Sequence, residues 1–227
     1  MTRISTDGLD FADPDLEREL ELLRGPIGAW RIDREVQIRA LEKLGLEPHH
    51  RLVEIGCGPF QAGAPLVRYL DPGHYTGVDI SAERLDAARE VVRRFGLDDR
   101  EPHLIRSDDF GLDQLEPATF DRLWSFHVVI HFPEPAVRRF MQAAAALLKP
   151  DGIGWFSAWV TPDREEFNRR GSWLEFPVTE AGSGYFKTLA ADAGLDCTGL
   201  GTLEEWGLPS DRPAARNWLF ELKHSLD

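Results

Sequence analysis

The stretch Leu52-Val53-Glu54-Ile55-Gly56-Cys57-Gly58-Pro59-Phe60 decides the fold of this 227-residue chain. Four residues that favour a buried strand run directly into a loop that contains two glycines. Small residues at such a turn let the backbone approach a bound ligand closely. The stretch therefore predicts a strand, a ligand-binding turn and the start of a helix.

Strand-like and helix-like patterns alternate after this stretch. Short apolar runs predict strands at 75–78, 103–106, 120–125 and 153–158. Apolar residues at helical spacing predict helices at 66–70, 82–95, 137–148 and 183–193. Such alternation requires crossover connections and gives a mostly parallel sheet with helices on both faces. Because ligands of such sheets bind beyond the carboxyl ends of the strands, the loops at that edge are expected to hold the site.

The two ends of the sequence depart from this alternation. Apolar residues at three- and four-residue spacing predict amphipathic helices at 15–23 and 36–44. Residues 1–45 are therefore predicted to be a helical extension or lid, and residues 46–227 the main domain. Two strand-like runs, 197–203 and 217–222, follow without a helix between them, which predicts an antiparallel hairpin.

The composition is that of an acidic globular protein. Lys and Arg number 26 against 39 Asp and Glu, which gives a formal net charge of -13. This charge repels a phosphate backbone, so nucleic acid is not expected as a partner. The sequence lacks an apolar signal core and any run near the roughly 18 apolar residues that span a bilayer, which predicts a cytoplasmic location without membrane contact. Cys57 and Cys197 have no neighbours at metal-ligand spacing, so we expect two reduced thiols and no metal site.

Acidic residues stand beside the predicted loops. Glu54 precedes the first glycine by two residues. Asp79 lies about 20 residues past the loop, the spacing expected of a carboxylate that accepts hydrogen bonds from ribose hydroxyls. Asp108 and Asp109 follow the third predicted strand, where a carboxylate can accept from an adenine amine. Asp79 also has a structural interpretation as a helix N-terminal acid, and Asp108 and Asp109 as solvated turn residues.

The glycine loop differs from the dinucleotide fingerprint G-x-G-x-x-G. The third glycine of that fingerprint would fall at Gln61, and Pro59 removes a backbone N–H that a pyrophosphate would need. S-adenosylmethionine carries no phosphate, and its sulfonium and ammonium groups suit the carboxylate of Glu54. A nicotinamide-dependent oxidoreductase is the alternative enzyme, and a module that only binds S-adenosylmethionine is the alternative without catalysis.

These motifs jointly resemble the class I methyltransferase family. The resemblance rests on the E-x-G-x-G loop, the acids after the second and third strands, and the segments FDRLWSFHVVIHF and LLKPDGIGWFS. Phe60-Gln61 stands where a similar bacterial group has Leu-Arg. The resemblance implies an α/β Rossmann-like sheet of strand order 3-2-1-4-5-7-6, with strand 7 antiparallel and helices on its faces. It also implies S-adenosylmethionine as the cofactor.

The expected reaction is methyl transfer to an oxygen or nitrogen of a small molecule such as a sugar, a peptide or another metabolite. A hydroxyl or ammonium acceptor must lose a proton, and His127 and His131 follow the fourth predicted strand, where a base is expected. The resemblance favours His131, and either histidine also has an interpretation as a packing residue. The predicted cofactor-contacting residues are Trp30, Glu54, Gly56, Cys57, Gly58, Pro59, Asp79, Ile80, Asp108, Asp109 and Phe126.

Overall fold

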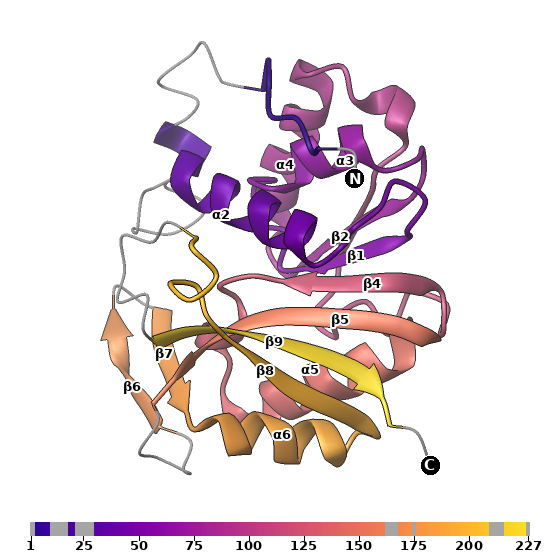
Figure 1. The fold of residues 1–227 in the computed structure, drawn as a ribbon. Coiled ribbons are helices and arrows are strands. Elements are labelled where there is room, and N and C mark those ends of the chain that lie inside the picture. The colour runs from indigo at the N-terminus through magenta and orange to yellow at the C-terminus, as the bar shows by residue number, and fades with distance from the viewer. Residues whose placement is uncertain are drawn as a thin grey trace. The chain divides into compact units, whose positions relative to one another are not determined.

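A computed structural model describes residues 3–9, 18–20, 30–161, 168–173, 176–208 and 216–225 of the chain (Figure 1). The chain divides into two units, Met1–Asp108 and Asp109–Asp227, and each buries apolar side chains. The predicted helix at 15–23 lies mostly outside the described residues. Among the residues described, no helix has the length and apolarity that crossing a membrane requires.

The first unit holds three parallel strands and the helices that connect them. Its strands are β1 (Leu52–Ile55), β2 (Tyr75–Asp79) and β3 (His103–Arg106), with β2 in the middle. Its helices are α2 (Trp30–Lys43), α3 (Gly63–Tyr69), α4 (Ala82–Arg94) and the short 3-10 helix η1 (Asp98–Arg100). Every residue of β1 and β2 is buried, including the polar residues Glu54, Thr76 and Asp79.

The second unit combines parallel and antiparallel strands. β4 (Phe120–Ser125) and β5 (Leu148–Val160) pair in parallel, and the end of β5 also pairs in parallel with β7 (Phe176–Ala181). The other strands are β6 (Asn168–Trp173), β8 (Leu195–Thr202) and β9 (Asn217–His224). The helices are η2 (Val129–His131), α5 (Glu134–Leu147) and α6 (Ser183–Ala191). α5 and α6 lie side by side (Figure 1). Phe140 of α5 and Phe186 of α6 contact Phe156 and Phe220 of the sheet.

The strand order agrees with the predicted one. The strands run β3-β2-β1-β4-β5-β7-β6, and β9 pairs with both β5 and β8. The pairs β5–β9 and β8–β9 are antiparallel. The predicted order did not count the β6–β7 hairpin. Without that hairpin, β5, β9 and β8 take the places of the predicted strands 5, 7 and 6, and β9 is the antiparallel strand. The Rossmann-like sheet with a C-terminal antiparallel hairpin is thus confirmed.

Some predicted boundaries were wrong. The helix predicted at 36–44 begins at Trp30, and the one predicted at 66–70 begins at Gly63. A helix ends before residues 149–152 as expected, since α5 ends at Leu147, but these residues lie within β5, whose predicted start was 153. Phe120 pairs with Leu148 but Arg122 pairs with Ile153, so the turn-forming residues bulge out of the strand without ending it.

Candidate active site

The loop after β1 adopts a backbone conformation that needs glycine. Gly56 has a φ of 78° and Gly58 a φ of 55°, values that residues with a Cβ rarely adopt. The backbone N–H groups of Gly56 and Cys57 donate to the Val78 carbonyl at 2.7 and 3.1 Å. The loop is therefore fixed against the end of β2, as expected for a tight strand-to-helix turn.

Asp79, the last residue of β2, contacts this loop directly. Its carboxylate accepts hydrogen bonds from the backbone N–H groups of Gly58 and Ser81, both at 2.9 Å. The side chain is only 5% exposed, yet an ionised carboxylate has about four acceptor positions, so two bonds leave capacity for more. Ile80 follows and is 62% exposed, which places a large apolar side chain at the surface beside the acid.

Glu54 of β1 is a buried acid next to the same loop. The Tyr75 hydroxyl donates to its Oε2 at 2.5 Å. Burial raises the pKa of Glu54 to about 8, because it disfavours the charged form more strongly than the Tyr75 hydrogen bond favours it, and the charge of Asp79 raises it further. Burial likewise raises the pKa of the Cys57 thiol. Glu54 and Cys57 are therefore mainly protonated near neutral pH in the ligand-free chain.

Phe60, the first of the two residues that stand where a similar bacterial group has Leu-Arg, has a packing role. Its φ is 74° and its side chain is fully buried, with the ring edge-to-face against Tyr75 at 5.4 Å between centroids. A Cβ added at Gly63 would lie 2.2 Å from the Phe60 ring. The large ring is thus accommodated because the first residue of α3 is a glycine.

Gln61, the other half, connects the glycine loop to α2. Its Nε2 donates to the backbone carbonyl of Trp30 at 2.6 Å, and its Oε1 accepts from Gln37 Nε2 at 3.1 Å. All three side chains are buried. The structure therefore brings the predicted Trp30 to the loop through its backbone, a link that the sequence analysis missed because no pattern pairs positions so far apart.

The acids after β3 have different environments. Asp108 is exposed and ends the first unit. Asp109 belongs to the second unit, where both of its oxygens accept from Arg139 of α5 at 2.6 Å. These hydrogen bonds lower the pKa of Asp109. Pro59 is buried beside Gly58 in the first unit.

The two predicted histidines lie in the segment that follows β4. Phe126 is buried and stacks on Trp124, with ring centroids 5.5 Å apart. His127 is half-buried and its ring lies 4.0 Å from that of Phe126. His131 ends η2, is half-buried, and its backbone N–H donates to the Val128 carbonyl at 2.9 Å.

His127 is held by two residues that the sequence analysis did not identify. Its backbone N–H donates to Ser157 Oγ of β5 at 2.8 Å, and its Nε2 lies 2.5 Å from Asn217 Nδ2 of β9. Ser157 and Asn217 are both fully buried. A polar residue inside or at the start of an otherwise apolar strand was the available signal.

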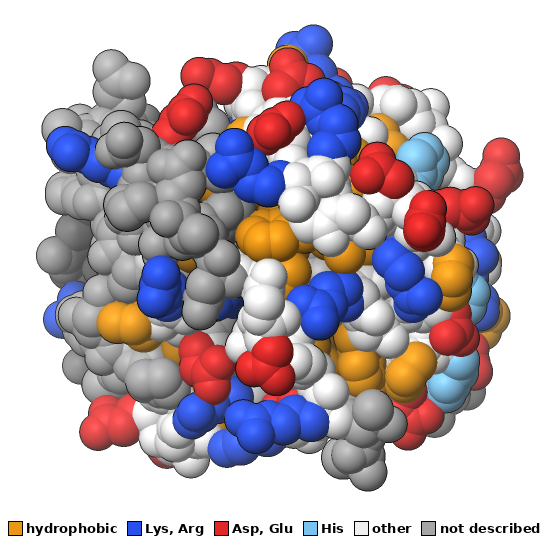
Figure 2. Space-filling view, turned by 90° about the horizontal axis from the view of Figure 1, so that it is seen from above, with side chains coloured by type: hydrophobic (Ala, Val, Ile, Leu, Met, Phe, Trp, Pro, Cys, Tyr) orange, Lys and Arg blue, Asp and Glu red, His pale blue; other side chains and the backbone are white. Residues whose placement is uncertain are grey.

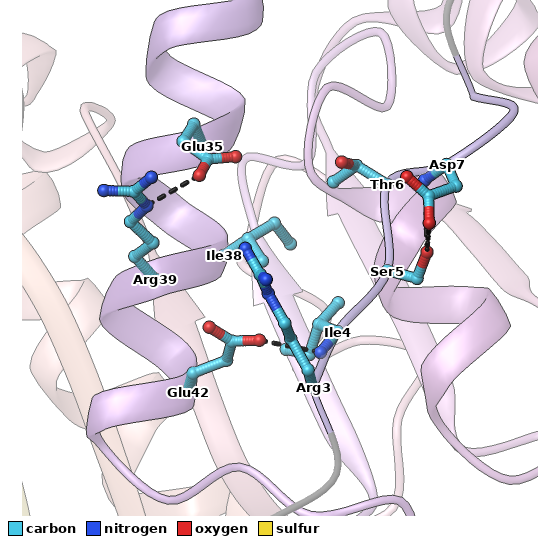
Figure 3. A pocket seen from close by; sticks show the side chains of 9 residues that line it. All are labelled: Arg3, Ile4, Ser5, Thr6, Asp7, Glu35, Ile38, Arg39 and Glu42. Carbon is cyan, nitrogen blue, oxygen red and sulfur yellow. Dashed lines mark hydrogen bonds and ion pairs between the residues drawn. The ribbon is translucent and has the colours of Figure 1, made fainter.

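A surface pocket of about 180 Å³ lies elsewhere in the first unit, between residues 3–7 and α2 (Figure 3). Within it, the Ile4 backbone N–H donates to Glu42 at 2.7 Å, and Arg39 pairs with Glu35 at 2.6 Å. The pocket is lined by Arg3, Ile4, Ser5, Thr6, Asp7, Glu35, Ile38, Arg39 and Glu42. Because this lining includes none of the predicted site residues, the pocket is not part of the candidate site.

Comparison with known proteins gives related sequences and folds. Residues 52–152 match a family described as a methyltransferase domain. The methyltransferase GfsG of Streptomyces halstedii is 30% identical over 118 residues, 49% of this chain and 38% of that protein. A ubiquinone biosynthesis O-methyltransferase of Neisseria meningitidis is 31% identical over 107 residues, 47% of this chain and 43% of that protein. The alignments thus cover less than half of each relative.

Solved structures share the fold. The structure of the DhpI-SAH complex aligns with a TM-score of 0.61 at 16% identity, over 94% of this chain and 95% of that one. At this identity the similarity concerns the fold alone.

Proposed function

Because the chain contains a methyltransferase domain of the class I fold, we propose that it transfers a methyl group from S-adenosylmethionine to an oxygen or nitrogen of a small molecule. The observation that carries this proposal is the contact between the Gly58 backbone and the Asp79 carboxylate. It joins a tight glycine turn to an acid at ribose-binding spacing. Pro59 and Gln61 make the same turn unsuited to a pyrophosphate.

The acidic groups at the loop suit a cationic ligand, because a cation beside Glu54 favours ionisation of its carboxyl group. Glu54 and Asp79 bring two buried carboxyl groups beside the loop, and no Lys or Arg within the described part of the chain forms an ion pair with either. We assign Glu54 to the cofactor ammonium and Asp79 to the ribose hydroxyls. Ile80 offers an apolar surface to the adenine, and Asp108 an acceptor for its amine. The backbone of Gly56, Cys57, Gly58 and Pro59 surrounds the methionine part.

The N-terminal residues are part of this proposal. Gln61 ties Trp30 and α2 to the cofactor loop, which supports a role for residues 1–45 as an extension that takes part in cofactor binding. Phe126 and Asp109 are proposed as further cofactor contacts because they follow β4 and β3 in the sequence. Because Asp109 is already paired with Arg139, Asp108 is the stronger candidate of the two acids.

The acceptor side is assigned to the residues after β4. Bound S-adenosylmethionine supplies an activated methyl group on a sulfonium. The chain's contribution is to align the acceptor and to receive its proton, and alignment can account for most of the rate. We assign His131 as the group that takes the proton from a hydroxyl or ammonium acceptor, with His127 beside it in the sequence as a second contact.

A small-molecule acceptor fits the charge of the chain. The formal net charge is -13, and Figure 2 shows Lys and Arg side chains interspersed with Asp and Glu on the face that it draws. Such a surface gives no counterion-release contribution to the binding of nucleic acid. The similarity to an O-methyltransferase supports oxygen as the methylated atom.

Calorimetry tests this function without knowledge of the acceptor. We expect S-adenosylmethionine and S-adenosylhomocysteine each to bind at one site per chain, and NADH to give no heat. A screen of metabolite fractions for a gain of one methyl mass then identifies the acceptor. Tight NADH binding without binding of S-adenosylmethionine would overturn the proposal, whereas cofactor binding with no methylated product across broad fractions would favour the non-catalytic module.

A further inference from the structure

We propose that Asn217 is a positioning residue that holds the His127 imidazole in one orientation and in one tautomer, with the proton on Nδ1. This inference rests on the proposed methyl transfer, since it gives His127 its place in the acceptor site. Asn217 lies 90 positions from His127 in the sequence, and no motif connects the two.

The sheet topology brings both residues to one edge. His127 follows β4, whose last residue is Ser125, and therefore lies at the carboxyl edge of the parallel strands. β9 runs antiparallel to β5, and its first residue, Asn217, pairs with Trp159 near the end of β5. The amino end of β9 thus lies beside the carboxyl end of β5, at the edge where ligands of such sheets bind.

The same strand register places Ser157 and Asn217, the two residues that hold His127, on one face of the sheet. Ser157 pairs with Leu219 on β9, two residues from the Trp159–Asn217 pair, so Ser157 and Asn217 project from the same side of the sheet. Phe156 and Phe220 project from the other side, where they meet the aromatic rings of α5 and α6. Ser157 and Asn217 therefore lie on the face opposite the core that those helices form.

The backbone of His127 is held in a conformation that residues with a side chain rarely adopt. Its φ is 56°, in the left-handed region that non-glycine residues rarely adopt. The Ser157 hydroxyl accepts from its backbone N–H, and the Phe126 ring lies against the imidazole. Strained residues fixed by surrounding contacts are commonly found at functional sites. The ring is therefore held from the backbone, from one face and, through Asn217, from Nε2.

The Asn217 amide determines which imidazole nitrogen carries the proton. Its Nδ2 faces His127 Nε2 at 2.5 Å, and an amide nitrogen donates but does not accept. With the amide in this orientation, Nε2 is the accepting nitrogen, which puts the proton of the neutral ring on Nδ1. An imidazolium would set two donors against each other, so this contact opposes protonation. His127 accordingly serves as a hydrogen-bond donor through Nδ1, and the proton-accepting role falls to His131.

Nuclear magnetic resonance of the ¹⁵N-labelled histidines tests the inference directly. We expect the His127 signals of the native chain to report the Nδ1–H tautomer at neutral pH. In Asn217→Asp, a carboxylate beside Nε2 should raise the His127 pKa by about one unit or more and move the proton of the neutral ring to Nε2. The signals of His74, a half-buried residue of the first unit, should be the same in both proteins and serve as the control. An Nε2–H tautomer in the native chain, or a His127 pKa unchanged in the variant, would overturn the inference.

Asn217→Leu supplies the functional readout. It removes the donor at similar volume, and we expect a fall of about tenfold in kcat with the Kd for S-adenosylhomocysteine unchanged. A normal kcat would count against the positioning role. If this variant does not fold, the tautomer of the native chain and the titration of Asn217→Asp still test the inference. Neither of those measurements needs a cofactor or an acceptor. A wrong inference about His127 and Asn217 can therefore be distinguished from a wrong proposal of methyl transfer.

Discussion

The backbone N–H of Gly58 donates a 2.9 Å hydrogen bond to the side chain of Asp79, and so joins the loop after β1 to the end of β2. The residues are 21 positions apart. The position of the loop therefore depends on Asp79, so a ligand that contacts Gly58 meets a loop that Asp79 holds in place. The pairing makes Asp79 both a proposed cofactor contact and a support for the loop.

Asp79→Ala is expected to weaken S-adenosylhomocysteine binding at least about fivefold, or about 1 kcal/mol, because the ribose hydroxyls lose a charged acceptor. Isothermal titration calorimetry measures the effect. Asp86→Ala is the matched control, since Asp86 is an exposed residue of α4 that pairs only with Arg89 among the ion pairs described. An unchanged Kd in a folded Asp79→Ala protein would remove Asp79 from the cofactor site.

Glu54 should give the native chain a distinctive dependence of stability on pH. Its pKa is about 8 when folded and has an ordinary value of 4.5, so the folded state holds a proton that the unfolded state releases between these values. The free energy of unfolding should therefore fall as pH rises from 4.5 to 8, by up to about 1.4 kcal/mol per pH unit from this group.

Glu54→Gln removes that titration but keeps an oxygen that accepts from the Tyr75 hydroxyl. Denaturant unfolding of both proteins at several pH values should show the variant gaining stability relative to the native chain as pH rises. Parallel profiles for the two proteins would mean that Glu54 is ionised in the folded chain across this range.

Gln61→Leu should lower the free energy of unfolding by about 1–3 kcal/mol, because it removes the donor to the Trp30 carbonyl and the acceptor of the Gln37 amide within a buried cluster. Gln114→Leu, at an exposed position, is the control and should change stability by less than about 0.5 kcal/mol. Equal effects of the two substitutions would show that the link between α2 and the loop contributes little.

His131→Ala is expected to reduce turnover by roughly 100-fold while the cofactor Kd stays within a few-fold, since a general base acts on the acceptor and not on cofactor binding. In the native enzyme the rate should rise with pH near the ordinary histidine pKa of about 6.5, because the neutral imidazole takes the proton. Pre-steady-state rates across pH provide the measurement. If the rise persists in the variant, another group accepts the proton.

The sequence predicted the sheet and its order because alternating periodicity and crossover handedness leave few arrangements open. It also placed Glu54, Asp79 and the glycine turn at one edge, since those residues adjoin the strands that position them. The β6–β7 hairpin was not predicted: NRRGSW and FPVTEA lack a clear alternation of apolar and polar residues.

Contacts between distant segments account for what was missed at the site. Nothing in the sequence around Gln61 shows that its amide reaches α2, and nothing around His127 indicates Asn217. The His127–Asn217 pair follows from strand register, and the Gln61 contacts follow from where α2 lies in the folded chain. The bulge at residues 149–152 was not predicted for a related reason: its Pro, Asp and Gly favour a turn, but the strand continues through them with a shift of register.

The place of β9 beside β5 has a consequence for how the second unit folds. Trp159 pairs with Asn217 and Gly154 with Leu222, so this ladder joins segments roughly sixty residues apart and requires a long loop to close first. The β1–β2 ladder joins segments much nearer in sequence. In refolding experiments, amide protons of β1 and β2 should gain protection before those of β9, and the His127 anchor should be among the last features to form.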